Sequence, residues 1–176
     1  PLPGTIRARV SGSLSTLRTE GSLELAPEWK HILQMPFISR ASQLVLPPER
    51  APGAGGRWFI PFVADSAGLE VRGARLEVPP LVLILNGSFD RNGNVNMECD
   101  IVLPQDEAAH SLSSSAVATL AISPDSIRIP VRAVGRMTSP SFNLRHEIIR
   151  SHEVSSELER YIRMRRLQEG VESLLP

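Results

Sequence analysis

The fold is decided by residues 94–103, NVNMECDIVL, in which apolar and polar side chains alternate. Successive side chains of a β-strand point to opposite faces of its sheet, so this alternation predicts a strand with one dry and one wet face. The dry face carries Val95, Met97, Cys99, Ile101 and Leu103.

The residues upstream predict antiparallel neighbours for this strand. Residues 81–89 are mostly apolar and lead into Asp-Arg-Asn-Gly at 90–93, where Asn92-Gly93 predicts a tight hairpin turn built on positive φ angles. Residues 58–64 and 68–78 predict a second pair of strands with a bulge at Gly73, before Pro79-Pro80 forces a corner. The middle of the chain is therefore an antiparallel sheet.

Weaker patterns flank this region. Residues 5–10 and 22–25 predict strands, and residues 127–134 predict a late strand that Pro130 places at an edge of the sheet. Residues 47–56 and 104–116 are rich in Pro and Gly or in acidic and Ser residues, and predict loops.

The C-terminus has a helical period. Apolar side chains from Val154 onward recur at helical spacing, Ser156 and Glu159 fit a capping box, and Gly170 suits a helix end. We expect an amphipathic helix over residues 151–169, of about four turns.

The composition argues against several classes of function. Lys and Arg number 19 against 19 Asp and Glu, so no long-range field draws the chain to nucleic acid, and we expect no nucleic-acid partner. The longest apolar run, residues 81–85, is far shorter than the roughly 20 residues that span a bilayer, so the chain as given is expected to be soluble. Because it begins at Pro1 rather than at a methionine, we expect a processed chain or a piece of a longer protein.

Reactive groups do not converge in the sequence. The four histidines lie far apart without metal-ligand spacing, and the serines at 111–115 lack a nucleophile elbow. The single cysteine, Cys99, falls on an apolar strand face and is interpreted as packing. We therefore expect no catalytic residue, metal or cofactor.

One basic stripe has two interpretations. Arg128, Arg132 and Arg136 recur every four residues, which places them on one face of a strand. They either face a phosphate or form a solvated edge that prevents strand-on-strand aggregation.

The order of these strands resembles the C-terminal region of AsmA-like (AsmA/TamB-type) proteins. The resemblance rests on WFIPFVADSAGLEV at 58–71, ARLEV at 74–78, LILNGSFD at 83–90, GNVNMECD at 93–100 and IPVRAVGRMTSPSF at 129–142. It covers about residues 58–165, and a looser match covers residues 4–26. The chain departs from the family in lacking an N-terminal membrane anchor and in its long loops at 47–56 and 104–116.

The resemblance implies a mainly β fold: an elongated, curved antiparallel sheet, an open trough or half-barrel, with a C-terminal amphipathic helix. We expect one domain, with N-terminal strands and a turn segment in residues 1–46, a core sheet in 58–144 and the helix at 151–169. The implied role is non-catalytic handling of phospholipid or another acyl lipid in the bacterial periplasm. Envelope proteins are further implied partners, and membrane contact, including an inner-membrane anchor, is expected in segments absent from this chain.

On this interpretation the dry sheet face shields acyl chains. Its candidate lining residues are Leu69, Val71, Leu76, Val78, Leu83, Leu85, Val95, Met97, Cys99, Ile101 and Leu103. Each CH₂ left in water costs about 0.8 kcal/mol, so an apolar surface that covers the acyl chains lowers the free energy of carrying a lipid through water. Two alternatives stay open: the same residues pack against the C-terminal helix as a plain core, or the chain is a structural or protein-interaction module that recruits a partner by strand addition.

Overall fold

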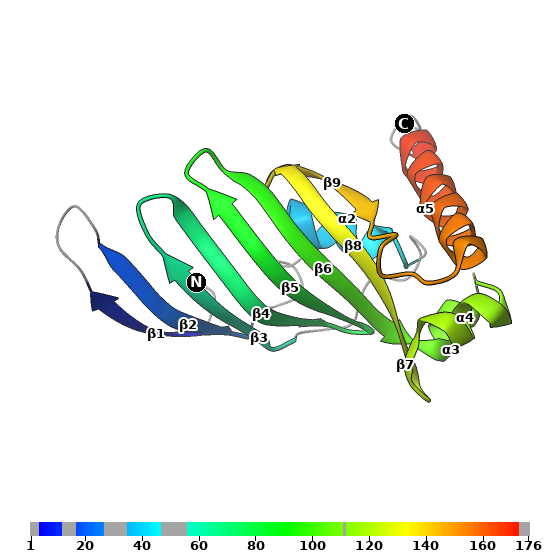
Figure 1. The fold of residues 1–176 in the computed structure, drawn as a ribbon, viewed down its shortest axis with the longest axis horizontal. Coiled ribbons are helices and arrows are strands. Elements are labelled where there is room, and N and C mark those ends of the chain that lie inside the picture. The colour runs from blue at the N-terminus through cyan, green and yellow to red at the C-terminus, as the bar shows by residue number, and fades with distance from the viewer. Residues whose placement is uncertain (1–3, 12–16, 27–34, 47–55, 111, 173–176) are drawn as a thin grey trace.

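The computed structural model describes residues 4–11, 17–26, 35–46, 56–110 and 112–172, with side chains described as far as Met164. Its main feature is one open antiparallel sheet of nine strands in the order β1-β2-β3-β4-β5-β6-β8-β7, with β9 also paired to β8 (Figure 1). The strands are β1 Gly4–Ser11, β2 Arg18–Leu25, β3 Trp58–Ala64, β4 Gly68–Val78, β5 Leu81–Asp90, β6 Asn94–Pro104, β7 Ala121–Ser123, β8 Ser126–Arg136 and β9 Ser139–Leu144. The prediction of a mainly β chain with a C-terminal helix is confirmed.

Four helices among the described residues gather at the β9 end of the sheet. They are α2 Pro36–Gln43, α3 Gln105–Ala109, α4 Ser114–Leu120 and α5 His152–Glu172. Figure 1 shows α2 against the sheet behind β8 and β9, α3 and α4 beyond the ends of β6 and β8, and α5 beside them. We call these four helices, with residues 44–46, the helical cap. The opposite end of the sheet, β1 to β3, extends away from it.

The strand register shows which side chains share one face of the sheet from strand to strand. Leu83, Ile101 and Ile129 lie opposite one another on β5, β6 and β8. Directly opposite residues of an antiparallel pair point to the same side, so these define what we call the inner face. By the same register, Ile6, Leu23 and Ile60 of β1, β2 and β3 lie on the inner face too, so the apolar face runs the whole width of the sheet.

Two predicted hairpins are present, with one correction to a turn. Gly73 is the bulge: its φ is 65°, the register shifts beside it, and its N–H donates to Asn86 Oδ1 at 2.7 Å. At residues 90–93 only Gly93 has a positive φ, of 76°, and Asn92 does not. The Asn-Gly turn with two positive φ angles was therefore wrong. Asp90 forms the turn instead, since its Oδ1 accepts the backbone N–H groups of Asn92 and Asn94.

The edge position predicted for Pro130 was also wrong, because β8 lies inside the sheet, between β6 and its partners β7 and β9. The far side of β8 is shared: β7 pairs with Ser126 and Ile127, and β9 pairs with residues 131–136. Pro130 falls in the gap between them, where its carbonyl accepts the N–H of Arg145. The N–H that proline lacks would have pointed into that gap, so the ladder with β6 is complete without it.

The helical predictions need three corrections. Residues 104–116 are not a loop but contain α3 and the start of α4, whose N-cap Ser113 accepts the N–H of Ala116. Helix α5 begins after Ser151, whose Oγ accepts the N–H of Val154, so Ser156 does not cap it, and it continues past Gly170 to Glu172. The third correction is α2, which lies in the N-terminal segment where only strands and a turn were expected. The loop predicted at 47–56 lies, but for Gly56, outside the described residues.

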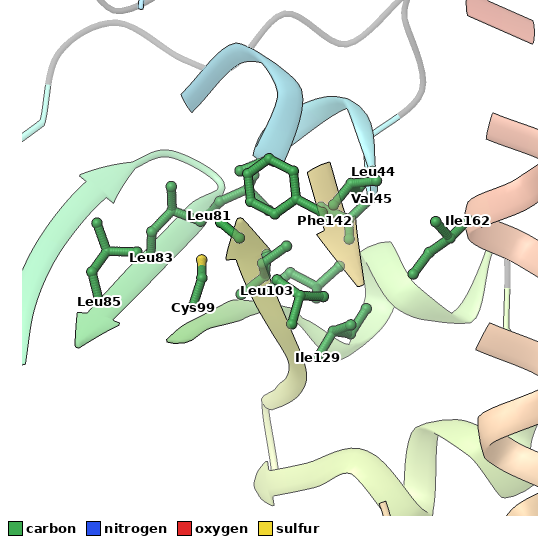
Figure 2. Packing of buried hydrophobic residues seen from close by; sticks show 14 of the residues in the cluster. Leu44, Val45, Leu81, Leu83, Leu85, Cys99, Leu103, Ile129, Phe142 and Ile162 are labelled. Carbon is green, nitrogen blue, oxygen red and sulfur yellow. The ribbon is translucent and has the colours of Figure 1, made fainter. Parts of the chain in front are cut away.

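Side chains from distant parts of the chain hold the cap to the sheet. The Phe37 ring of α2 packs on Phe142 of β9, with centroids 5.3 Å apart, and Arg40 Nη1 donates to the Pro140 carbonyl at 3.1 Å. Tyr161 of α5 donates its hydroxyl to the Val45 carbonyl at 2.8 Å. Figure 2 shows the resulting core, in which Leu44, Val45 and Phe142 lie close to Leu81, Leu103 and Ile129.

Candidate functional site

The predicted lining residues are mostly inside the protein. Ten of the eleven, all except Leu69, are buried, and Val78, Leu83, Cys99 and Ile101 have no exposed surface. They belong to one cluster with apolar side chains of the helical cap (Figure 2). In this structure they form a core, as the alternative of a plain core expected, but α2, α3 and α4 contact the strands and α5 packs against α4, so the C-terminal helix is only one part of the cover. Leu69 is half-buried at the margin of the cluster.

Cys99 lies in the middle of this core. Burial raises the pKa of its thiol far above the usual value, and the neighbouring Asp100 carboxylate adds to the effect. A thiol that is buried and has a raised pKa is a poor nucleophile and a poor metal ligand. Cys99 therefore packs as a small apolar residue, as its position on the strand predicted.

The apolar face becomes accessible on β1 to β3. Ile6 and Val10 of β1 are 69% and 60% exposed, and Leu23, Ile60 and Phe62 of the next two strands are half-buried. The register places Ile6 beside Leu23 and Ile60 in one row, and Ala8 beside Gly21 and Phe62 in the next. We call Ile6, Ala8, Val10, Leu23, Ile60 and Phe62 the open patch.

Sequence reasoning missed the open patch as a site, although its signal was present. Ile6, Ala8 and Val10 alternate with Thr5, Arg7 and Arg9, the same period-two pattern that marked β6. The prediction concentrated on the central strands because their runs are longer and more apolar. The inner-face side chains of those strands form one buried cluster with side chains of the helical cap.

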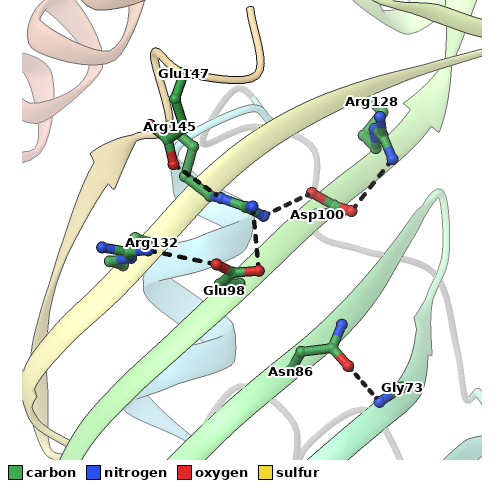
Figure 3. A network of polar contacts seen from close by, with 8 residues as sticks. All are labelled: Gly73, Asn86, Glu98, Asp100, Arg128, Arg132, Arg145 and Glu147. Carbon is green, nitrogen blue, oxygen red and sulfur yellow. Dashed lines mark hydrogen bonds and ion pairs between the residues drawn. The ribbon is translucent and has the colours of Figure 1, made fainter.

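The outer face of the covered strands carries a charge network, seen in Figure 3. Arg145, whose side chain is only 13% exposed, reaches Glu98 Oε2 at 3.1 Å and Asp100 Oδ1 at 3.8 Å. Its Nε lies 3.5 Å from Glu147 Oε1. The pKa of Glu147 lies below its usual value because its carboxylate accepts its own backbone N–H and, secondly, lies beside Arg145. The network ties the segment after β9 to β6.

Two of the three candidate phosphate-facing arginines belong to this network. Arg128 Nη1 lies 3.6 Å from Asp100 Oδ2, and Arg132 Nη2 lies 3.4 Å from Glu98 Oε1 (Figure 3). These carboxylates compete with any phosphate for the two guanidinium groups. Arg136 lies on the same strand, exposed, near the β6 end that begins at Asn94. Their phosphate-facing role stays a prediction.

A hollow of about 560 Å³ lies at the ends of β1 to β4, and none of the open-patch residues lines it. Its lining combines Leu25 and Trp58 with Glu24, Arg57, Arg75 and Glu77, and Arg75 Nε pairs with Glu77 Oε1 at 3.3 Å. With charges of both signs at its rim, the hollow does not select an anion.

One cluster has the composition of a hydrolytic triad. His146 Nδ1 lies 2.6 Å from Ser155 Oγ, and His146 Nε2 lies 3.1 Å from Glu159 Oε1. A nucleophile needs space for a substrate beside its oxygen, but Ser155 is only 6% exposed and lies within α5. The cluster ties the segment before α5 to the helix.

The described residues contain neither a metal-binding cluster nor a helix that could span a membrane. Across the described parts of the chain, no group of three or more His, Cys, Asp or Glu side chains is arranged to hold a metal ion. Of the helices that the structure describes, none has both the length and the apolar character to cross a bilayer.

Comparison with protein-family models, curated proteins and solved structures found no match for this chain. The AsmA-like resemblance therefore stays a prediction from the strand and turn motifs at residues 58–142.

Proposed function

We propose that this chain is a non-catalytic lipid-handling module of the bacterial envelope, and that the open patch on β1 to β3 shields the acyl chains of a phospholipid. The observation that supports the proposal is an apolar sheet face that continues beyond the helical cap, with Ile6 and Val10 more than half exposed. Side chains of this kind are usually covered when they adjoin one another on a soluble protein. The periplasmic location implied by the resemblance belongs to the same proposal.

The dimensions of the patch suit an acyl chain. A strand of eight residues such as β1 is about 26 Å long at about 3.3 Å per residue. One leaflet contributes about 15 Å to a bilayer core of about 30 Å, so an acyl chain fits along the strand. Three strands spaced about 4.8 Å apart give width for more than one chain.

The energetics also favour a shield. Each CH₂ moved from water to an apolar surface gains about 0.8 kcal/mol, so even a few methylenes on the patch offset part of the cost of leaving a membrane. The patch is an open surface rather than a closed cavity. A lipid lying on it therefore stays partly hydrated, which suits transfer better than storage.

The test uses two double variants of equal charge. Ile6→Asp with Val10→Asp puts two carboxylates on the open patch. Ser11→Asp with Ser22→Asp puts them on the outer face, opposite Arg18 and Arg7, and serves as the control. Neither pair touches the buried core, so both variants should keep the fold, which circular dichroism checks.

The measurement is transfer of a phospholipid with a fluorescent acyl chain from phosphatidylcholine donor vesicles to acceptor vesicles. We expect wild type and the outer-face variant to accelerate transfer equally, and the inner-face variant to lose at least about tenfold of that acceleration, because burying a charge against an acyl chain is costly. Equal transfer by all three proteins, or no acceleration by wild type, would reject the lipid role.

A further inference from the structure

The two ends of the sheet differ in whether the backbone N–H and C=O groups of the edge strand have partners. At the far end, β9 is held by α2 through the Arg40 contact with Pro140. At the near end, no strand in the described part of the chain pairs with the outer side of β1. Alternate N–H and C=O groups of its eight residues therefore face solvent, along a full strand length.

The β1 edge lacks a bulge, a proline and an inward-pointing charge, so its protection against strand addition rests on the outer-face charges of Arg7 and Arg9. Its register with β2 runs without a shift from Gly4 to Ser11, and the strand contains no proline. Bulges, prolines and inward-pointing charges are the common protections of an exposed edge. Here the inner-facing side chains are Ile6, Ala8 and Val10, and the charges, Arg7 and Arg9, are on the outer face.

These two arginines disfavour the two self-pairings of β1 that are centred on the middle of the strand. If two copies of β1 paired antiparallel in register on Ala8, Arg7 of each would lie opposite Arg9 of the other. If they paired on Arg7, the two Arg7 side chains would face each other. Like charges directly opposite across a strand pair destabilise it. Both arginines are exposed on β1, and although Glu20 lies opposite Arg9, no ion pair joins either guanidinium group to an acidic side chain among the described residues.

We propose that β1 binds an antiparallel strand of a partner protein whose side chains alternate between acidic residues on the outer face and apolar residues on the inner face. The pairing of β1 with β2 provides the template. Glu20 lies opposite Arg9 on the outer face, and Leu23 lies opposite Ile6 on the inner face. A partner strand of the same character on the free side would place acidic side chains beside both arginines, where β2 offers Glu20 opposite Arg9 but Ser22 opposite Arg7, and would extend the apolar inner face by one strand.

The probe is a synthetic peptide, Thr-Glu-Val-Glu-Leu-Glu-Leu, whose first residue aligns with Val10 and whose first two Glu align with Arg9 and Arg7. The control peptide has Lys in place of each Glu, with the same alternation. Binding is measured by NMR titration of the full chain. Hydrogen exchange of the backbone amides of Gly4–Ser11 locates the contact.

We expect the acidic peptide to bind at least about fivefold tighter than the Lys peptide, from two exposed ion pairs gained against two repulsions. The difference should shrink at high salt. In the Arg7→Glu, Arg9→Glu double variant the preference should reverse, and amide protection on β1 should follow the peptide that binds. The arginines are on the exposed outer face, so the fold should persist.

Equal binding of the two peptides, or protection away from β1, would overturn the proposal. Sedimentation of the free protein provides a second check: a dimer that dissociates in the Ile6→Asp, Val10→Asp variant would identify a second copy as the occupant and would also overturn it. Because the lipid test changes different side chains on the opposite face, either proposal can fail while the other stands.

Discussion

Ile6 and Ile129 occupy equivalent places in two halves of one sheet: each is an inner-face isoleucine in an alternating strand. Ile129 is 1% exposed beneath the helical cap, and Ile6 is 69% exposed on β1. Alternation along a strand therefore decides which face is dry, but the rest of the chain decides whether that face is covered. The covered half, made of β4, β5, β6, β8 and β9, forms a core, and the open half, β1 to β3 apart from Trp58, which is buried in that core, is a surface available for function.

The two halves also differ in how they are cross-linked. In the covered half, Tyr161, Arg40 and Glu157 each bond to a backbone group more than 40 residues away in sequence. In the open half, each strand is held mainly by its neighbours in the ladder. Regions with few buried contacts open at lower free energy than a packed core, so we expect β1 and β2 to exchange their amides first.

The largest expected effect comes from truncating the two isoleucines separately. Ile129→Ala removes buried methylenes and leaves a cavity, which should lower the free energy of unfolding by about 2 to 5 kcal/mol. Ile6→Ala should lower it by less than about 1 kcal/mol, since the side chain is already in water. Urea denaturation followed by circular dichroism measures both. Similar losses for the two variants would mean that β1 is covered in solution and that the open patch does not exist.

The hairpins could be predicted from the sequence because their determinants are local. Gly73, Gly93 and the alternation of β6 lie within the strands and turns that they specify, so the β4, β5 and β6 pairing followed from residues close together. Even there, the turn type was wrong, because the Asp90 carboxylate satisfies the backbone without a positive φ at Asn92.

The helical cap could not be predicted as a cover, because it depends on contacts between distant segments. The bond from Tyr161 to Val45 spans 116 residues, and no period in either segment indicates it. α2 did carry a local signal, with Phe37, Ile38, Ala41 and Leu44 at helical spacing after Pro36, but eight residues are short for a pattern to be distinctive. For this reason the sequence predicted the site on the central strands, whereas the structure leaves β1 to β3 open: which strands stay open depends on where the cap docks.

A smaller effect should follow from loosening the cap without altering the sheet. Tyr161→Phe keeps the buried ring and removes the hydroxyl that donates to the Val45 carbonyl at 2.8 Å. A single buried hydrogen bond contributes about 0.5 to 1.5 kcal/mol, with a further cost for the carbonyl left unpaired. Urea denaturation should show that loss, and hydrogen exchange should rise in α2 and α5 but not in β1 or β2. Faster exchange in β1 would show that the cap stabilises the open half as well.

The smallest effect is electrostatic and concerns the exposed turn at the end of the covered half. The pKa of Asp90 lies below its ordinary value of 3.8, chiefly because its carboxylate accepts a hydrogen bond from the Asn94 side chain and then from backbone N–H groups of Asn94 and Asn92. A carboxyl whose pKa is lower in the folded protein stabilises the fold fully above the unfolded value, and this contribution is lost as pH falls through the folded value. Asp90→Asn keeps an acceptor oxygen but not the charge, so wild type should be slightly more stable than the variant at pH 7, with the difference disappearing below the folded pKa. Thermal melts from pH 7 to pH 2 measure it, with Glu20→Gln as the control on the open half. A difference that persists at the lowest pH would mean that the shape of the side chain, rather than its charge, holds the β5–β6 turn.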